Sequence, residues 1–441
     1  MTLLARAFRR SPYDRDIFRL ALPALGALAA DPLVSLVDTA YVGRLGTRSL
    51  GAVAVAAAVF GVAFTVFNFL AYGTTPLVAR EIGRGNAVDA GRVAAAAAIV
   101  GVVLGVAAMV LLLWFPHPPL RMLGVGPQLL DQATTYLRIR ALALPAVLLV
   151  TVGHGVFRGA LDTRTPLAVA IGLNLVNLVL DPILIFGFGL GVAGAAWATV
   201  FAQWLGAIGF GVVLVRRHRA MGLDIAVPGW EEARALAGAG RNLVLRTVAL
   251  LTVFTTTTAV AARLGEVAVA SHQITLQLFT FLSLILDGIA IAAQAMLGAA
   301  TGVADAAAMR RQADRLVGLG VLAGAALGLL LVAVSPWLAA VFTPDSEVVA
   351  GVRSVYPQLV LVQVLGGAVF AWDGIVIGAT DFRFAMVSTM VPAVVATAAL
   401  LPVVSLGGSL AVVWWVVVLL MVLRTALLAW WHGARLTPAV V

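Results

Sequence analysis

Long apolar stretches alternate with short polar breaks along nearly the whole chain. A helix of roughly 20 apolar residues crosses the ~30 Å hydrocarbon core of a bilayer. Because a lipid-exposed backbone must satisfy its own hydrogen bonds, and these stretches are too long for barrel strands, the pattern predicts helices. We therefore expect an all-α integral membrane protein with twelve transmembrane helices, at residues 17–42, 50–78, 93–115, 130–155, 166–187, 192–215, 236–262, 267–299, 316–335, 350–375, 384–404 and 409–431.

The pattern also repeats, because a single ungapped shift of 219 residues brings identical residues into line across a region of more than 120 residues. The shift places Arg44, Phe60, Gly155, Gly159 and Asp162 on Arg263, Phe279, Gly374, Gly378 and Asp381. Each half holds six helices, an even number, so the halves share one orientation and are related by an axis along the membrane normal. The chain is predicted to be two six-helix bundles, an N-terminal lobe (1–215) and a C-terminal lobe (235–441), joined by a cytoplasmic linker (216–234).

Composition supports a membrane location and excludes several kinds of chemistry. Hydrophobic residues make up 62% of the 441 residues, charged residues 11%, and the mean hydropathy is +1.05. The absence of cysteine excludes disulfides and thiol nucleophiles, and the five histidines include no HExxH pair. No cofactor is expected beyond a coupling ion.

The distribution of the basic residues indicates how the chain is oriented in the membrane. All 29 are arginines, and with a cytoplasmic N-terminus 20 of them fall in inside segments and 5 in outside loops. This bias predicts a multi-pass protein of the cell membrane with both termini in the cytoplasm. Because the arginines are scattered through short loops, the pI near 11.1 does not indicate nucleic-acid binding. The basic start also fits a cleaved signal peptide, but the apolar stretch continues past Asp31 and belongs to the repeat.

Five acidic residues fall inside predicted spans, where a charge at the bilayer centre costs at least ~2.5 kcal/mol. They must face protein or water, or carry a proton. The repeat serves as an internal control, because the two halves do not keep the same acids. Under the shift, Asp38, Asp181, Asp287 and Asp373 align with Thr257, Leu400, Asn68 and His154. The intramembrane acids therefore have different roles in the two halves.

The fifth helix carries a polar stripe. In "IGLNLVNLVLDPILIFGFG", Asn174, Asn177 and Asp181 are spaced i, i+3, i+7 and share one helix face. The matching residues of helix 11 are apolar: Ala393, Ala396 and Leu400. This difference predicts a hydrated pocket in the N-terminal half. The alternative is that the asparagines are interhelical hydrogen-bond donors worth ~0.6 kcal/mol each.

The first helix combines acids with prolines. Asp31 and Asp38 are seven residues apart, so they share a helix face at a rise of roughly 10 Å. Pro23 and Pro32 each remove a backbone donor, which lets the helix bend. Because a partly dry pocket disfavours the charged form of a carboxyl group, we interpret Asp38 as a group that loads and releases a proton. For Asp31, a local bond to backbone ahead of Pro32 is an equal alternative.

The C-terminal half offers candidate ion pairs. Arg246 in helix 7 is predicted to pair with Asp287 in helix 8, and Arg424 in helix 12 with Asp373. Buried pairs of this kind are more often structural than functional. Two arginines of helix 4, Arg138 and Arg140, are two residues apart and so point to different sides.

Four segments resemble the multidrug and toxic compound extrusion (MATE) family, in particular its DinF-like branch: "LALPALGALAADPLVSLVDTAYVGRLGT", "NLVLDPILIFGFG", "RTVALLTVFTTTTAVAARLG" and "LILDGIAIAAQAMLG". The resemblance covers nearly the whole chain. It implies an efflux antiporter in which Asp38, Asn177 and Asp181 form the cation or substrate site, and helix 1 bends at Pro23 on protonation. Asp373 is similar to a helix-10 acid of sodium-using relatives, but helix 7 carries only Arg246 where those relatives have an acid.

These observations predict a proton-coupled exporter of small organic, often cationic or amphipathic compounds, acting as a monomer in the lipid bilayer. Sodium coupling, or a lipid-linked precursor flippase of the same superfamily, is the alternative; a flippase needs a strongly basic cavity, and the chain has four intramembrane arginines. An enzyme is not expected, because neither GxGD nor GxSxG is present. A scaffolding protein has little reason to keep polar stripes in hydrocarbon.

Overall fold

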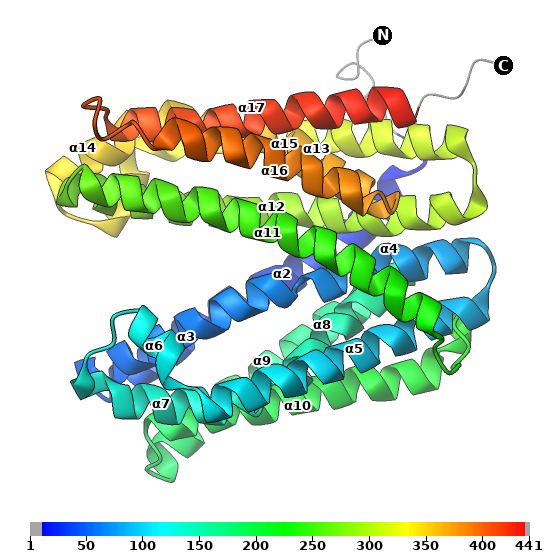
Figure 1. The fold of residues 1–441 in the computed structure, drawn as a ribbon, viewed down its shortest axis with the longest axis horizontal. Helices are drawn as coiled ribbons and strands as arrows, with labels where there is room; N and C mark the ends of the chain where they lie inside the picture. The colour runs from blue at the N-terminus through cyan, green and yellow to red at the C-terminus, as the bar shows by residue number, and fades with distance from the viewer. Residues whose placement is uncertain (1–10, 437–441) are drawn as a thin grey trace. The chain divides into compact units, whose positions relative to one another are not determined.

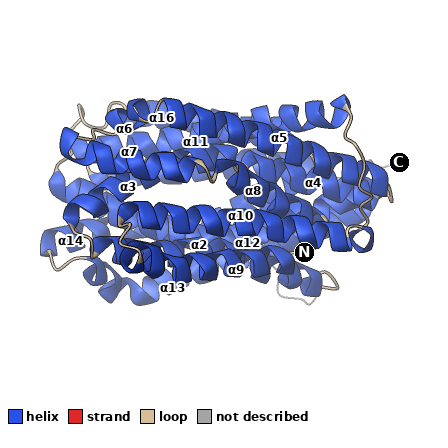
Figure 2. Ribbon diagram, turned by 90° about the horizontal axis from the view of Figure 1, so that it is seen from below, coloured by secondary structure: helices blue, strands red, loops and turns tan. Residues whose placement is uncertain are grey.

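The computed structural model describes residues 11–436, and helices form most of this range, with no strand (Figures 1 and 2). In chain order, the first half contains α2 (Asp14–Gly43), α3 (Thr47–Phe67), α4 (Phe69–Gly83), α5 (Ala87–Trp114), α6 (His117–Met122), α7 (Pro127–Ala141), α8 (Leu144–Gly159), α9 (Arg164–Pro182), the π-helical turn η1 (Ile183–Gly187), α10 (Val192–Arg217) and the 3₁₀ turn η2 (Arg219–Met221). The second half contains α11 (Trp230–Arg263), α12 (Glu266–Val303), α13 (Ala306–Phe342), α14 (Ser346–Ser354), α15 (Tyr356–Gly378), α16 (Phe382–Leu400) and α17 (Leu410–Arg435).

The prediction of an all-α protein with twelve spans is confirmed. Within residues 11–436, eleven helical segments are long and apolar enough to cross a membrane, and the number becomes twelve if the bent pair α7 and α8 forms one span. Each predicted span has a helical counterpart. The first one, α2, is a single helix that contains both Pro23 and Pro32.

The repeat seen in the sequence is present in the helix boundaries. Helices α3, α5 and α7 begin at Thr47, Ala87 and Pro127, and α12, α13 and α14 begin 219 residues later, at Glu266, Ala306 and Ser346. Turns repeat as well. Leu161 and Thr380 occupy equivalent positions, and both adopt the left-handed conformation (φ 58° and 60°) that non-glycine residues seldom take.

Two equivalent glycines, one in each half, are explained by close helix packing. A Cβ on Gly155 of α8 would lie 2.9 Å from Thr74 Cβ and 3.1 Å from the Ala71 carbonyl oxygen of α4. In the second half, a Cβ on Gly374 of α15 would lie 2.3 Å from the Ala290 carbonyl oxygen of α12. Glycine at these positions lets the two helices of each pair approach closely.

The helices form two compact units. The N-terminal unit is Leu22–Gly240, and the described residues of the C-terminal unit are 11–21 and 241–436. Two helices therefore contribute to both units: α2 passes from one to the other after residue 21, and α11 after residue 240.

This division differs from the sequence-based lobes in two places, for reasons of side-chain and backbone pairing. The start of α2 belongs to the C-terminal unit, where the Arg315 guanidinium of α13 donates to both Asp14 oxygens at 2.5 and 2.8 Å. The segment 216–234 belongs to the N-terminal unit, where the Asp224 backbone N–H donates to the Ala87 carbonyl at 2.8 Å. The sequence repeat shows which positions of the two halves correspond, but it does not show these contacts between residues far apart in the chain.

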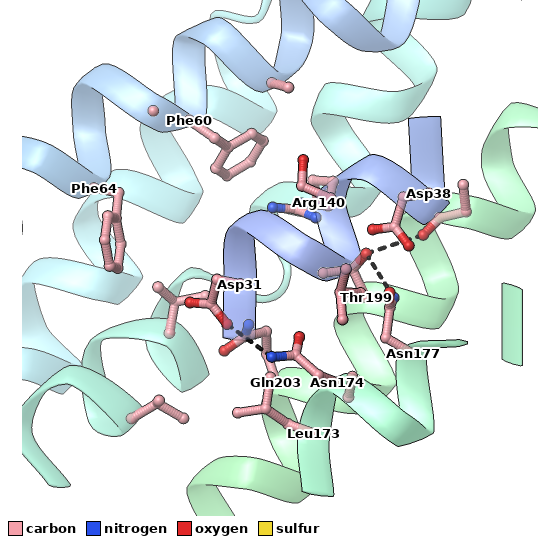
Figure 3. A pocket seen from close by; sticks show the side chains of 18 of the residues that line it. Asp31, Asp38, Phe60, Phe64, Arg140, Leu173, Asn174, Asn177, Thr199 and Gln203 are labelled. Carbon is pink, nitrogen blue, oxygen red and sulfur yellow. Dashed lines mark hydrogen bonds between the residues drawn. The ribbon is translucent and has the colours of Figure 1, made fainter. Parts of the chain in front are cut away.

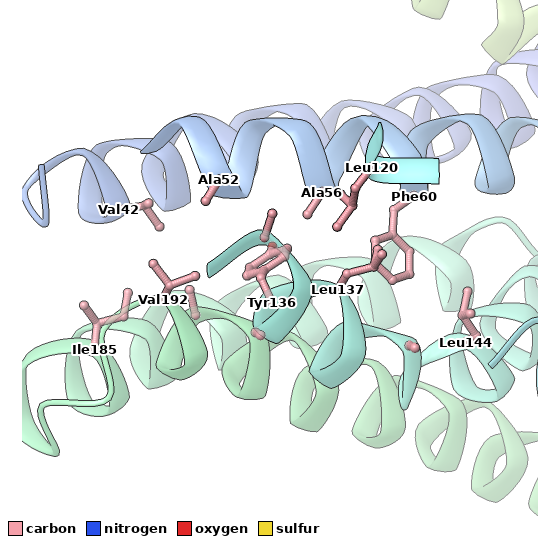
Figure 4. Packing of buried hydrophobic residues seen from close by; sticks show 14 residues of the cluster. Val42, Ala52, Ala56, Phe60, Leu120, Tyr136, Leu137, Leu144, Ile185 and Val192 are labelled. Carbon is pink, nitrogen blue, oxygen red and sulfur yellow. The ribbon is translucent and has the colours of Figure 1, made fainter. Parts of the chain in front are cut away.

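Within the N-terminal unit, a buried apolar cluster holds α2, α3, α7 and α10 together (Figure 4). Its members include Val42, Ala56, Phe60, Tyr136 and Val192. Phe60 and Tyr136 also line the neighbouring cavity, so the core supports one wall of the site described next.

Candidate functional site

A cavity of about 430 Å³ lies inside the N-terminal unit, between α2, α3, α7, α8, α9 and α10 (Figure 3). Most of its wall is apolar, and valine, leucine, alanine and phenylalanine side chains dominate. The polar and charged side chains that line it are Asp31, Ser35, Asp38, Thr39, Tyr136, Arg140, Thr151, His154, Asn174, Asn177, Thr199 and Gln203. An apolar wall with a few convergent polar groups is typical of a small-molecule site.

The polar stripe of α9 faces this cavity and the helices beside it. Asn174, Asn177 and Asp181 are buried, with exposures of 8%, 4% and 1%. The Asn174 side-chain amide donates to Asp31 at 3.0 Å, and that of Asn177 donates to the Thr199 hydroxyl at 3.2 Å (Figure 3). Asp31 thus has a side-chain partner 143 residues away, a contact that the local-backbone alternative did not include.

Asp181 is buried and is not among the residues that line the cavity, and its carboxyl group interacts electrostatically with that of Asp38. Among the described residues, neither Asp181 side-chain oxygen has a hydrogen-bond partner. The predicted stripe on α9 and the predicted acid on α2 are therefore brought together. Two carboxyl groups in contact cannot both carry a full charge without repulsion.

Sequence reasoning missed Arg140. It lies in the last turn of α7, lines the cavity, and interacts electrostatically with Asp38 and Asp181. Its guanidinium carbon is 5.0 Å from the centre of the Phe60 ring. The repeat carried a signal that could have found it, because the equivalent residue of α15 is the fully buried Leu359.

A break in the helical backbone places this arginine. The axes of α7 and α8 differ by 51°, and Leu142 and Ala143 lie between the two helices. The Trp204 indole N–H of α10 donates to the Leu142 carbonyl at 3.2 Å, which satisfies a backbone group freed by the break. Irregular backbone at membrane depth is tolerated where it is buried in protein or lines a cavity.

The other candidate residues of this half lie outside the cavity lining. Asn68 is at the junction of α3 and α4, where its backbone carbonyl accepts from Ala71 and Tyr72. Pro23 lies within α2, just after the helix passes into the N-terminal unit. Its position fits a bending point but not a direct contact with a ligand in the cavity.

The C-terminal unit contains a separate charged cluster. Arg246 of α11 and Arg424 of α17 both donate to the same Asp373 oxygen of α15, at 2.6 and 2.5 Å. The predicted Arg424–Asp373 pair is thus present. Arg246 of α11 bonds Asp373 of α15, and its predicted pair with Asp287 stays a prediction. Asp287 is half-buried within α12.

Comparisons with known proteins agree with this architecture. A family profile described as MatE matches residues 23–183 and 243–403, one match in each half. The chain is 33% identical to the protein DETOXIFICATION 44, chloroplastic, of Arabidopsis thaliana, over 96% of this chain and 83% of that protein. It is 33% identical to the DNA damage-inducible protein F of Escherichia coli, over 69% and 67% of the two chains.

A solved structure of a MOP superfamily transporter from Pyrococcus furiosus has the same fold. The TM-score is 0.88, with 99% of this chain and 98% of that chain covered. Sequence identity is 22%, so this likeness concerns the fold alone.

Proposed function

This chain belongs to the MatE family as a DinF-like, multi-pass membrane transporter of the multidrug efflux class, and we propose that it exports organic cations in exchange for protons. The observation that carries the proposal is the mainly apolar cavity of the N-terminal unit, which Asp38 and Asn177 line and beside which the buried Asp181 interacts electrostatically with Asp38. The family to which this chain belongs is one of membrane transporters.

The chemistry of the carboxyl pair supports exchange. Two carboxyl groups in contact are stable together when they share a proton or face another positive charge. A proton and an organic cation therefore compete for the same negative charge, so that the arrival of one favours the release of the other. The cavity volume of about 430 Å³ lies within the range of drug-sized sites.

The position of Pro23 supports a way to couple this exchange to movement. Proline lacks a backbone N–H, so the carbonyl one turn earlier in α2 loses its helical partner. Pro23 follows directly on the part of α2 that the Asp14–Arg315 pair holds in the C-terminal unit. We propose that α2 bends near Pro23 when the charge state of Asp38 changes.

The alternatives differ in what they require of the cavity. A flippase for a lipid-linked pyrophosphate requires several cationic groups, and Arg140 is the one arginine among the residues that line this cavity. That composition favours the exporter. Sodium remains the alternative coupling ion, because a carboxyl pair attracts either cation.

The remaining assignments follow the family and the arginine distribution. We propose small organic substrates, a monomeric protein, and the cell membrane as its location, with both termini in the cytoplasm. Because a related plant protein is named as chloroplastic, the proposed membrane rests on the arginine distribution and not on sequence similarity. Residues 1–10 and 437–441, including the N-terminal Arg6, Arg9 and Arg10, lie outside the described part of the chain.

Transport by purified protein in liposomes tests the proposal. Ethidium flux is measured under a pH gradient alone and a sodium gradient alone. We expect the pH gradient to drive flux and Asp38→Asn or Asp181→Asn to abolish it, with normal yield. Asp131→Asn, which alters an exposed acid on α7, is the matched control. Flux driven only by sodium would replace the proton with sodium, and undiminished flux in both site variants would remove the site.

A further inference from the structure

Arg140 is fixed at the cavity wall by its surroundings. Its guanidinium carbon lies 5.0 Å from the centre of the Phe60 ring and 5.8 Å from that of Tyr136, distances at which a cation and an aromatic ring attract each other. Both rings belong to the buried apolar cluster, so they are packed by neighbouring side chains. Among the described residues, the Arg140 Nε has no hydrogen-bond partner.

This fixed positive charge acts on the carboxyl pair. Arg140 interacts electrostatically with both Asp38 and Asp181. When both acids are ionised, the pair carries two negative charges, and the guanidinium offsets one of them. The cluster formed by Asp38, Asp181 and Arg140 then has room for a single positive charge before these three groups together become net positive. In a low-dielectric site an excess charge is strongly unfavourable.

We infer that Arg140 determines the charge class of the substrate, by favouring singly charged organic cations over doubly charged ones at the Asp38–Asp181 site. This inference rests on the proposed function, since it concerns the same cavity. In this exchange, one singly charged organic cation replaces one proton at the carboxyl pair. A dication would leave the cluster with one uncompensated positive charge.

Other titratable groups face the same space, and they are the same in the parent and in an Arg140 variant. They are Asp31 from α2, Tyr136 from α7 and His154 from α8. Asp31 is held by Asn174, at 3.0 Å. Because an Arg140 substitution removes one charge and leaves these groups in place, a change in charge preference is attributable to the guanidinium.

The repeat indicates that the fold does not need an arginine at this position. The equivalent residue Leu359 is fully buried in the continuous helix α15. An arginine kept only for packing on Phe60 would affect stability, and it would change the transport of singly and doubly charged probes to the same extent.

Ethidium and propidium form a matched pair of probes, because they share one aromatic cation and propidium carries a second quaternary ammonium group. In liposomes with a pH gradient, we expect the parent protein to have a higher kcat/KM for ethidium than for propidium. Arg140→Gln and Arg140→Met should raise the propidium-to-ethidium ratio roughly tenfold, because one opposing charge is removed. Arg140→Lys keeps the charge and should keep the parent ratio.

Arg138→Gln is the matched control, because Arg138 is two residues away, exposed, and not part of the cavity lining. A parent that prefers propidium overturns the inference even if no Arg140 variant folds. So does an unchanged ratio in Arg140→Gln and Arg140→Met, or an equal change in Arg138→Gln. In those cases, ethidium flux that still depends on Asp38 and Asp181 leaves the proposed exchange intact. A parent that moves neither probe under a pH gradient contradicts the proposed function itself.

Discussion

The two halves of the chain share one helical plan but differ in polarity at the same helix. In the N-terminal unit, α9 buries Asn174, Asn177 and Asp181, and in the C-terminal unit α16 buries Ala393, Ala396 and Leu400 at the equivalent positions. The backbone register is therefore preserved while the side chains diverge. We conclude that the repeat supplies the scaffold and that the candidate site occupies one copy of it.

The halves also differ in helix continuity. The N-terminal unit has a junction at Asn68 and a 51° bend at residues 142–143, and the equivalent parts of α12 and α15 are unbroken. The bend lies beside the charged groups of the cavity. Where the C-terminal unit buries charge, at Asp373, it does so between continuous helices. Broken helices thus accompany the candidate binding site, as is common in transporters.

The largest effect is expected from placing an acid in the apolar helix α16. Leu400→Asp places a carboxylate in a fully buried position. We expect a loss of ~5 kcal/mol, because charge insertion costs ~3 and lost packing about 2 kcal/mol. Thermal unfolding in detergent measures the loss. Leu400→Met is the volume-matched control and should change stability little. A well-folded aspartate variant would mean that α16 already faces water.

A second change removes the shared carboxylate of the C-terminal cluster. Asp373→Asn leaves Arg246 and Arg424 without their common charged partner, and breaking a buried pair costs ~3–5 kcal/mol. We expect a lower unfolding temperature and a retained dependence of ethidium flux on pH. Glu347→Gln, at an exposed acid of α14, is the control. If Asp373→Asn keeps parental stability but uncouples transport from protons, the site is not confined to the N-terminal unit.

The glycine pair offers a graded test of packing in the two copies. A Cβ at Gly374 would lie 2.3 Å from a carbonyl oxygen, whereas at Gly155 the nearest atom is at 2.9 Å. We expect Gly374→Ala to destabilise by ~3 kcal/mol and Gly155→Ala by ~1 kcal/mol. Unfolding temperatures of the two variants provide the measurement. Gly172→Ala meets no atom within 4 Å and should be neutral or slightly stabilising. Equal losses at both sites would show that the copies pack alike.

The smallest expected effect concerns Asn174. Asn174→Ala gives α9 the residue that α16 has at this position and removes the hydrogen bond to Asp31. We expect a loss of ~0.6 kcal/mol, the usual contribution of such a bond between membrane helices, with transport lowered only a few-fold. Abolished transport at normal stability would instead assign Asn174 a direct role in binding. Comparing initial flux rates with unfolding temperatures separates the two outcomes.

Part of the site was predictable from the sequence, because the helix period and the repeat are local properties. The spacing of Asn174, Asn177 and Asp181 gave their shared face, and the apolar match in the other half marked that face as unusual. Arg140 was missed because the period shows that it and Arg138 point apart, but not which of them meets the cavity. That outcome depends on the bend between α7 and α8.

The membrane-spanning helices, the two-fold repeat and the acidic residues within the spans could be predicted from the sequence alone, because hydrophobicity and periodicity are local properties of each segment. Which side chains contact one another depends on how the helices pack. Arg246 and Asp373 are 127 residues apart in the chain, and Arg315 and Asp14 are 301 apart. A one-dimensional pattern fixes the face on which a side chain lies, but the partner on that face is chosen by how helices pack in three dimensions.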